Sequence, residues 1–159
     1  ETLMKFDINN PAPTQDQIEA YRVGLLAKRQ KKNIRLKQLL NLYMGLLVLA
    51  IFVISYRHSF NFMSLFSDPA FSKQLFAPFI FTITFSYFTA KHTKNSIFNI
   101  DSYIMDLEVL SPVENQQEFA KFKSMASTSK PIAEYLKSIN ETGRHPVRAE
   151  LYAAEDLSA

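Results

Sequence analysis

The chain has 159 residues, about the length of one domain, and a formal net charge of +3. It contains no cysteine, which excludes disulfides, Cys-ligated zinc, iron–sulfur clusters and a Cys nucleophile. Charge is also placed unevenly, because residues 39–56 and 74–90 contain no charged side chain at all.

Residues 1–14 are predicted to be a flexible segment that precedes a long helix. Thr14 and Gln17 have the spacing of a capping box, in which each side chain accepts a hydrogen bond from the other residue's backbone N–H. No proline follows until well beyond residue 56. One helix is therefore predicted from about 15 to 56, with a length of about 60 Å at 1.5 Å per residue.

A basic run lies directly before the first uncharged stretch. Residues 28–37 read KRQKKNIRLK, in which six of ten side chains are Lys or Arg. Interleaved aromatic residues, which single-stranded nucleic acids would stack on, are missing, so no nucleic-acid partner is expected. These side chains, with two lysines after the second stretch, are instead expected to contact anionic lipid headgroups and fix the topology: Lys28, Arg29, Lys31, Lys32, Arg35, Lys37, Lys91 and Lys94.

The two uncharged stretches, 39–56 and 74–90, are predicted to cross a membrane, because a helical span needs about 17–25 apolar residues. The first contains eleven Leu, Ile, Val or Phe residues, and its alternative is a buried core helix of a soluble protein. The second is less apolar, since it contains a proline, three threonines and a serine. Its alternative is a re-entrant or interfacial segment. Residues 57–73 between them are predicted to form an interfacial Phe-rich loop.

The distribution of positive charge predicts the orientation. Seven Lys or Arg residues lie within about 20 residues before the first span, whereas the loop between the spans carries only Arg57 and Lys73. By the positive-inside rule, both chain termini are predicted to be cytoplasmic. A short, charged chain with two spans is typical of the bacterial cytoplasmic membrane, which is the predicted localisation.

Small and polar residues recur on one side of the second span, and a shorter patch of the same kind lies in the first. The recurrence every three or four residues indicates one helix face. Two interpretations remain open: close packing with hydroxyl hydrogen bonds between helices, which is preferred, or a pore lined by Thr82, Ser86 and Thr89 in a homo-oligomer. The full set is Asn41, Gly45, Gln74, Pro78, Thr82, Ser86 and Thr89.

Apolar residues continue the helical periodicity on the cytoplasmic side of both spans. The second helix is predicted to extend to about Leu110, so that residues 15–110 form an antiparallel hairpin. A 3-4-3 spacing after the second span resembles a coiled-coil seam. The predicted seam consists of Ile18, Tyr21, Leu25, Ile97, Ile100, Ile104 and Leu107.

Residues 111–159 are predicted to be a cytoplasmic tail of three short amphipathic helices. Ser111-Pro112-Val113-Glu114 is typical of a helix start, and that helix is expected to end near Ala126. The second has Ile132, Tyr135, Leu136 and Ile139 on one face, with Gly143 as its cap. The third is expected to start at Pro146, with Val147, Leu151 and Ala154 on one face. Helices this short need a packing partner.

No reaction is indicated by the sequence. Motifs of serine hydrolases, P-loop enzymes and zinc proteases are absent, and neither span contains the ionisable residue that a transporter would need. No enzyme activity, metal or cofactor is therefore expected. The predicted protein is an all-α, two-span membrane hairpin that serves as a non-enzymatic accessory, scaffold or regulatory subunit. Its expected partners are the lipid bilayer and other membrane proteins or its own copies. The alternative function is a subunit of a small homo-oligomeric channel.

Overall fold

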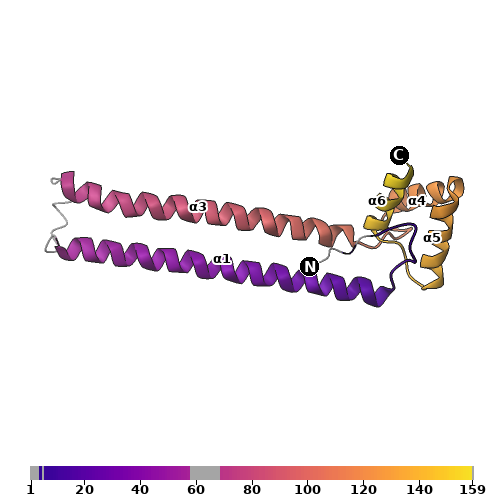
Figure 1. Ribbon diagram of the computed structural model, residues 1–159, viewed down its shortest axis with the longest axis horizontal. Helices are drawn as coiled ribbons and strands as arrows, with labels where there is room; N and C mark the ends of the chain where they lie inside the picture. Colours follow the sequence, from indigo (N-terminus) through magenta and orange to yellow (C-terminus); the bar gives the residue numbers. More distant parts are fainter. Residues whose placement is uncertain (1–3, 5, 58–68, 159) are drawn as a thin grey trace. The chain divides into compact units, whose positions relative to one another are not determined.

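The computed structural model describes residues 4, 6–57 and 69–158, and every regular element within these ranges is a helix (Figure 1). The helices are α1 (Gln15–Arg57), α3 (Pro69–Asp106), α4 (Gln116–Thr128), α5 (Lys130–Glu141) and α6 (Arg148–Ser158). The one extended pairing in this part of the chain is an isolated antiparallel bridge between Val109 and Val147. The predicted all-helical class is therefore confirmed.

Helix α1 begins as predicted from its capping box. The backbone N–H of Thr14 donates to Oε1 of Gln17 at 2.9 Å, and the N–H of Gln17 donates to Oγ1 of Thr14 at 3.3 Å. These two bonds satisfy donors that the first helical turn leaves without intrahelical partners. From there α1 continues without a break to Arg57, one residue beyond the predicted end.

The first and last residues of helix α3 differ from the predicted ones. It begins at Pro69, inside the segment 57–73 that was predicted as a loop, and residues 58–68 of that loop lie outside the described residues. It ends at Asp106 rather than near Leu110. Beyond Asp106 the backbone turns to pair with the chain before α6: the N–H of Leu110 donates to the carbonyl of Pro146 at 2.7 Å. The side chain of Leu110 is fully buried in an apolar cluster with residues of α4, α5 and α6.

The chain divides into two compact units, which are described separately. Unit 1 consists of Glu1–Lys28 with Asn99–Ala159, and unit 2 is Arg29–Phe98. This division cuts through both long helices, whereas the sequence predicted a boundary between residues 110 and 111. The helix ends belong with the tail because Ile18, Leu25 and Ile100 share a buried cluster with Val147.

Unit 1 has two apolar clusters. The first joins α4, α5 and α6 to the N-terminal segment and consists of Ile8, Ala12, Leu110, Phe122, Ile132, Tyr135, Ile139, Leu151 and Ala154. Residues 6–13, predicted to be flexible, are instead packed, because Ile8 and Ala12 bury their side chains here. Residues 1–3 and 5 of that segment lie outside the described part.

In the tail helices, the buried faces agree with the prediction better than the positions at which the helices begin. The buried faces of α5 and α6 are the expected ones, and Gly143 after α5 has the positive φ, 72°, that a helix cap of this kind requires. The start of α4 was predicted wrongly. Ser111 organises a turn, in which its Oγ accepts the N–H of Val113 at 3.2 Å and its carbonyl accepts the N–H of Asn115 at 2.9 Å. The helix therefore begins only at Gln116.

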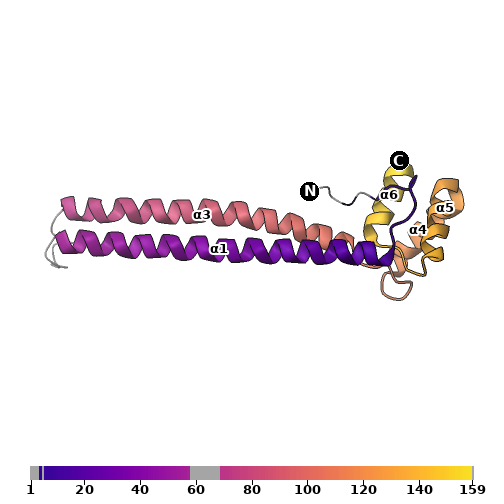
Figure 2. The ribbon, with the colours of Figure 1, turned by 60° about the horizontal axis from the view of Figure 1, so that its bottom comes forward.

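In unit 2, the stretches of α1 and α3 run antiparallel and side by side in both ribbon views (Figure 1 and Figure 2). Tyr43 of α1 meets Phe85 of α3 edge to face, with ring centroids 5.3 Å apart. Such pairs favour a specific register between two helices.

Among the described residues, α1 is the one helix that is both long and apolar enough to cross a membrane, and 11% of its apolar stretch is buried. Core helices of soluble proteins and signal sequences share this length and composition, so these properties alone indicate membrane association weakly. Helix α3 falls short in composition, because Pro78 and the Thr and Ser residues after it reduce its mean hydropathy.

Candidate functional site

The most extensive candidate site is the apolar surface of unit 2. Large apolar side chains of both helices are exposed within the described chain. On α1 they are Leu39, Leu42, Met44, Leu46, Val48, Leu49, Ile51, Phe52, Val53 and Tyr56. On α3 they are Phe76, Phe79, Ile80, Phe81, Ile83, Phe85, Tyr87 and Phe88. Monomeric soluble proteins rarely expose so continuous an apolar surface, which is typical of contact with lipid or another protein.

The small and polar stripe of α3 lies on its less exposed side. Pro78, Thr82, Ser86 and Thr89 are half-buried, whereas the aromatic residues between them are exposed. Pro78 and Thr82 line a cavity of about 280 Å³ together with Tyr43, Leu46 and Ala50 of α1. The stripe therefore faces α1 in unit 2, which supports the packing interpretation over the pore. The side chain of Gln74 lies outside the described residues.

The corresponding patch of α1 does not face α3. Asn41 and Gly45 are both exposed, and a methyl group built on Gly45 would meet no atom within 4 Å. The two residues therefore form a separate exposed patch and do not share an interface with the stripe of α3. A seven-residue period explains the difference, since Leu40, Tyr43 and Leu47 are the less exposed positions of this stretch.

The predicted headgroup residues are mostly exposed, with one exception. Lys32 is half-buried, and its ammonium group donates a hydrogen bond to Oγ of Ser96 across unit 2. Lys91 lies over the ring of Tyr87, with its Nζ 6.0 Å from the ring centroid. The exposed side chains are Lys28, Arg29, Lys31, Arg35, Lys37, Lys91 and Lys94.

Six of the seven predicted seam residues meet in unit 1. Ile18, Leu25, Ile100 and Leu107 are buried in one cluster, and Tyr21 and Ile104 pack against it. Ile97, the remaining residue, is half-buried in unit 2. The sequence did not predict that Val147 from the tail would complete this cluster.

Unit 1 contains a buried ion pair that was not predicted from the sequence. Arg144 binds Glu150 with two hydrogen bonds, from Nη1 to Oε2 at 2.9 Å and from Nη2 to Oε1 at 2.5 Å. The hydroxyl of Tyr135 donates to Oε1 at 3.0 Å, and the N–H of Val147 donates to Oε2 at 2.9 Å. Arg144 also donates from Nε to the carbonyl of Pro13 at 2.9 Å, which ties the N-terminal segment to the tail.

This arrangement fits a structural role. Burial, together with the charge of Glu150 and its hydrogen bond, raises the pKa of Tyr135, so its hydroxyl stays protonated and remains a donor. The spacing of Val147 and Glu150 is one signal that could have located the pair, since an acid three residues into a helix often accepts an N–H at its start.

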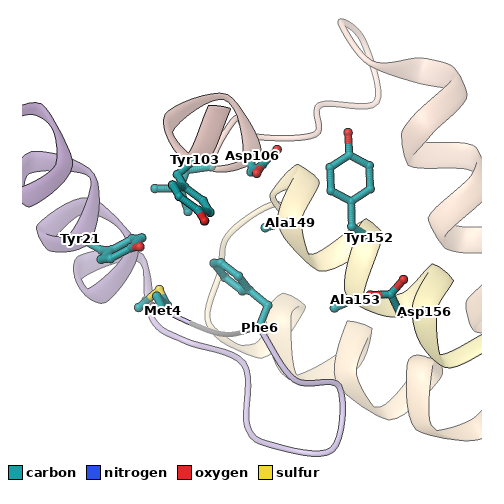
Figure 3. Close-up of a pocket in the computed structure, with 10 residues that line it drawn as sticks. Met4, Phe6, Tyr21, Tyr103, Asp106, Ala149, Tyr152, Ala153 and Asp156 are labelled. Carbon is teal, nitrogen blue, oxygen red and sulfur yellow. The ribbon is translucent and has the colours of Figure 1, made fainter. Parts of the chain in front are cut away.

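A cavity of about 300 Å³ opens elsewhere in unit 1 (Figure 3). Its walls come from the N-terminal segment and from α1, α3 and α6. The lining residues are Met4, Phe6, Tyr21, Tyr103, Asp106, Leu107, Ala149, Tyr152, Ala153 and Asp156. The described residues contain no group of three or more His, Asp or Glu side chains placed to hold a metal ion. The sequence did not indicate this cavity, because its aromatic residues come from four separate segments.

Asp106 in this cavity gives a pH prediction. Burial raises its pKa above the ordinary 3.8, an effect that the charge of Arg148 partly opposes. The folded protein therefore binds a proton at Asp106 more tightly than the unfolded chain does. The free energy of unfolding decreases as pH rises from the ordinary pKa of 3.8 through the higher pKa of the folded protein. Replacing Asp106 by Asn should remove that decrease. Unfolding curves of both proteins from below pH 3.8 to neutrality are the measurement; parallel curves would contradict the expectation.

Comparisons of the chain with protein-family models, with curated proteins and with solved structures found no match.

Proposed function

We propose that the chain is a non-enzymatic, two-span protein of the bacterial cytoplasmic membrane that serves as an accessory, scaffold or regulatory subunit of a larger membrane complex. The apolar surface of unit 2 carries this proposal. It covers the outward sides of both helices, whereas a core helix of a soluble protein would be covered by other elements.

The placement of polar side chains supports a second span in α3. Thr82, Ser86 and Thr89 reduce its hydropathy, yet they lie on the half-buried side and leave Phe and Ile on the exposed side. A lipid-facing helix can contain hydroxyl groups when they bond to their own backbone or a neighbouring helix. Pro78 also lies near one end of the 74–90 span, where a missing backbone donor has less effect.

The exposed basic residues support the orientation. Arg35 and Lys37 precede the first span, and Lys91 and Lys94 follow the second. In a two-span hairpin these four positions are on the same side of the membrane, and positive charge favours the cytoplasmic side. Both termini are then cytoplasmic.

A partner helix is proposed for the exposed patch of Asn41 and Gly45. Small residues let two helix backbones approach closely in a membrane. A methyl group at Gly45 would meet no atom of the described residues, so this approach is available to another membrane protein or a second copy.

Replacing Gly45 by Leu should therefore reduce a co-purifying partner severalfold and leave the hairpin folded. The chain would be extracted in mild detergent, and the bound proteins quantified by mass spectrometry. Val53→Leu, which enlarges another exposed residue of α1, is the matched control and should change nothing. If wild-type protein purifies alone and monomeric, or if Gly45→Leu retains its full partner, the proposed role is wrong.

A further inference from the structure

The cavity of unit 1 brings aromatic rings and carboxylates to one place. Phe6 lies at the middle of the close-up, with Tyr21 and Tyr103 on one side and Tyr152 and Asp156 on the other (Figure 3). The rings come from the N-terminal segment, α1, α3 and α6. Phe6 and Tyr21 pack against the apolar cluster that contains Ile18, Leu25 and Leu107, whereas Tyr103 and Tyr152 are exposed. The four rings border an open space of about 300 Å³.

Two carboxylates lie at this cavity. Asp106 is half-buried and Asp156 is exposed, and neither makes a hydrogen bond or ion pair to any residue that the structure describes. Arg148 influences the pKa of Asp106, but its guanidinium binds Glu108 at 2.7 Å and Glu118 at 3.2 Å. The charge of Arg148 is therefore already shared between two other carboxylates.

We infer that this cavity binds a small organic cation with an ammonium group. The faces of Tyr and Phe rings attract a cation, and the carboxylates of Asp106 and Asp156 provide the opposite charge. An anion would be repelled by the same two groups, and a neutral apolar molecule would leave Asp106 half-buried without a partner.

The size of the cavity restricts the ligand. A volume of about 300 Å³ lies at the lower limit of ligand pockets, which fits one ammonium headgroup rather than a drug-sized molecule. A bare metal ion fits less well, because eight of the ten lining residues are aromatic or aliphatic and only two are carboxylates. Choline is therefore a suitable probe, since its trimethylammonium group presents charge in a form that aromatic rings recognise.

Binding can be measured through tyrosine fluorescence. The protein has seven Tyr and no Trp, and three of the Tyr residues line this cavity. The full chain would be purified in a maltoside detergent, which has no ammonium group, and titrated with choline at constant ionic strength. We expect a saturable change in fluorescence. The matched neutral compound, 3,3-dimethyl-1-butanol, has the shape of choline without its charge and should give no saturable change.

Two variants test the assigned residues. Asp106→Asn should weaken choline binding by about fivefold or more, and the double change Asp106→Asn with Asp156→Asn should abolish it. Glu114→Gln removes the same charge at an exposed position outside the cavity and should bind choline as the wild type does. Circular dichroism of each variant would verify that its helices are retained.

The proposal is overturned if choline gives no saturable change, if the neutral compound binds equally well, or if the folded double variant binds like the wild type. The source of the cation is addressed by a last titration with dihexanoylphosphatidylcholine below its micelle concentration. If this lipid binds more tightly than choline, the site is assigned to a lipid headgroup. If it binds more weakly, the site is assigned to a soluble cation. Both results require that the cation site exists.

Discussion

Replacing Glu150 by Ala is expected to destabilise unit 1 by about 3–5 kcal/mol, the usual cost of removing one partner from a buried ion pair. Glu150 is 0% exposed, and Arg144 is 7% exposed. The change leaves the guanidinium of Arg144 buried without its counter-charge. It also leaves the N–H of Val147 and the hydroxyl of Tyr135 without their acceptor.

The cost should arise from the unpaired charge rather than from the pair itself. Bringing two charged groups out of water is costly, and their attraction offsets most of that cost. The double change Arg144→Met with Glu150→Leu should therefore recover much of the stability that either single change to Ala loses. If stability recovers in the double variant, the destabilisation of the single variants comes from the unpaired buried charge and not from a general loss of packing.

Hydrogen exchange of the full chain, followed by mass spectrometry, would measure these effects locally. Protection should decrease in α5, α6 and residues 6–13, because Arg144 also binds the carbonyl of Pro13. Glu155→Ala is the matched control: Glu155 pairs with Lys121 at 2.6 Å, but both side chains are substantially exposed, so the expected loss is at most about 1 kcal/mol. Equal effects of the Glu150 and Glu155 changes would contradict this account of unit 1.

The features that could be predicted from sequence depend on nearby residues. The capping box of Thr14 and Gln17 spans three positions, and its two hydrogen bonds are formed as expected. The buried face of α5 follows from the spacing of Ile132, Tyr135 and Ile139 within a single helix. Gly143 follows from the need for a positive φ after that helix.

The features that could not be predicted depend on contacts between distant residues. Leu110 leaves the helical pattern because its N–H binds the carbonyl of Pro146, which no local periodicity indicates. The contact from Arg144 to Pro13 joins residues 131 positions apart. The cavity of unit 1 likewise combines Phe6, Tyr103 and Tyr152, which are separate in sequence. Long-range pairing therefore determines both the packing of residues 6–13 and the candidate ligand site.

Replacing Ile83 by Arg should remove the proposed second span from the membrane. Ile83 is 52% exposed and lies near the middle of the 74–90 stretch. The eight strongly apolar residues of that stretch favour insertion by about 2–5 kcal/mol, on a scale of −0.3 to −0.6 kcal/mol for each. An arginine at the centre of a span opposes insertion by about 2.5–3.5 kcal/mol and also replaces one favourable residue. A single substitution is therefore about as large as the whole driving force.

The location of the C-terminal tail reports the result. The chain has no native cysteine, so Ser158→Cys provides one labelling site for a membrane-impermeant maleimide. With two spans, the tail lies on the cytoplasmic side and is not labelled from outside. In the Ile83→Arg protein the second span is lost, so the tail should become accessible to the maleimide or the protein should be degraded. Phe98→Arg is the matched control, since Phe98 is 72% exposed on the same helix but beyond the span.

The same measurement separates the two interpretations of α3. An interfacial helix tolerates an arginine, because the long side chain reaches the headgroups and its charge is attracted to anionic lipid. The tail would then keep its location in the Ile83→Arg protein, and the exposed Phe and Ile residues of α3 would lie at the membrane surface. In a helix that crosses the bilayer, an arginine at the centre cannot place its charge among the headgroups. A tail that is labelled from outside in both the wild-type and the Ile83→Arg protein would therefore leave α1 as the one membrane-crossing helix of the described chain, with the tail on the side opposite to residues 6–37.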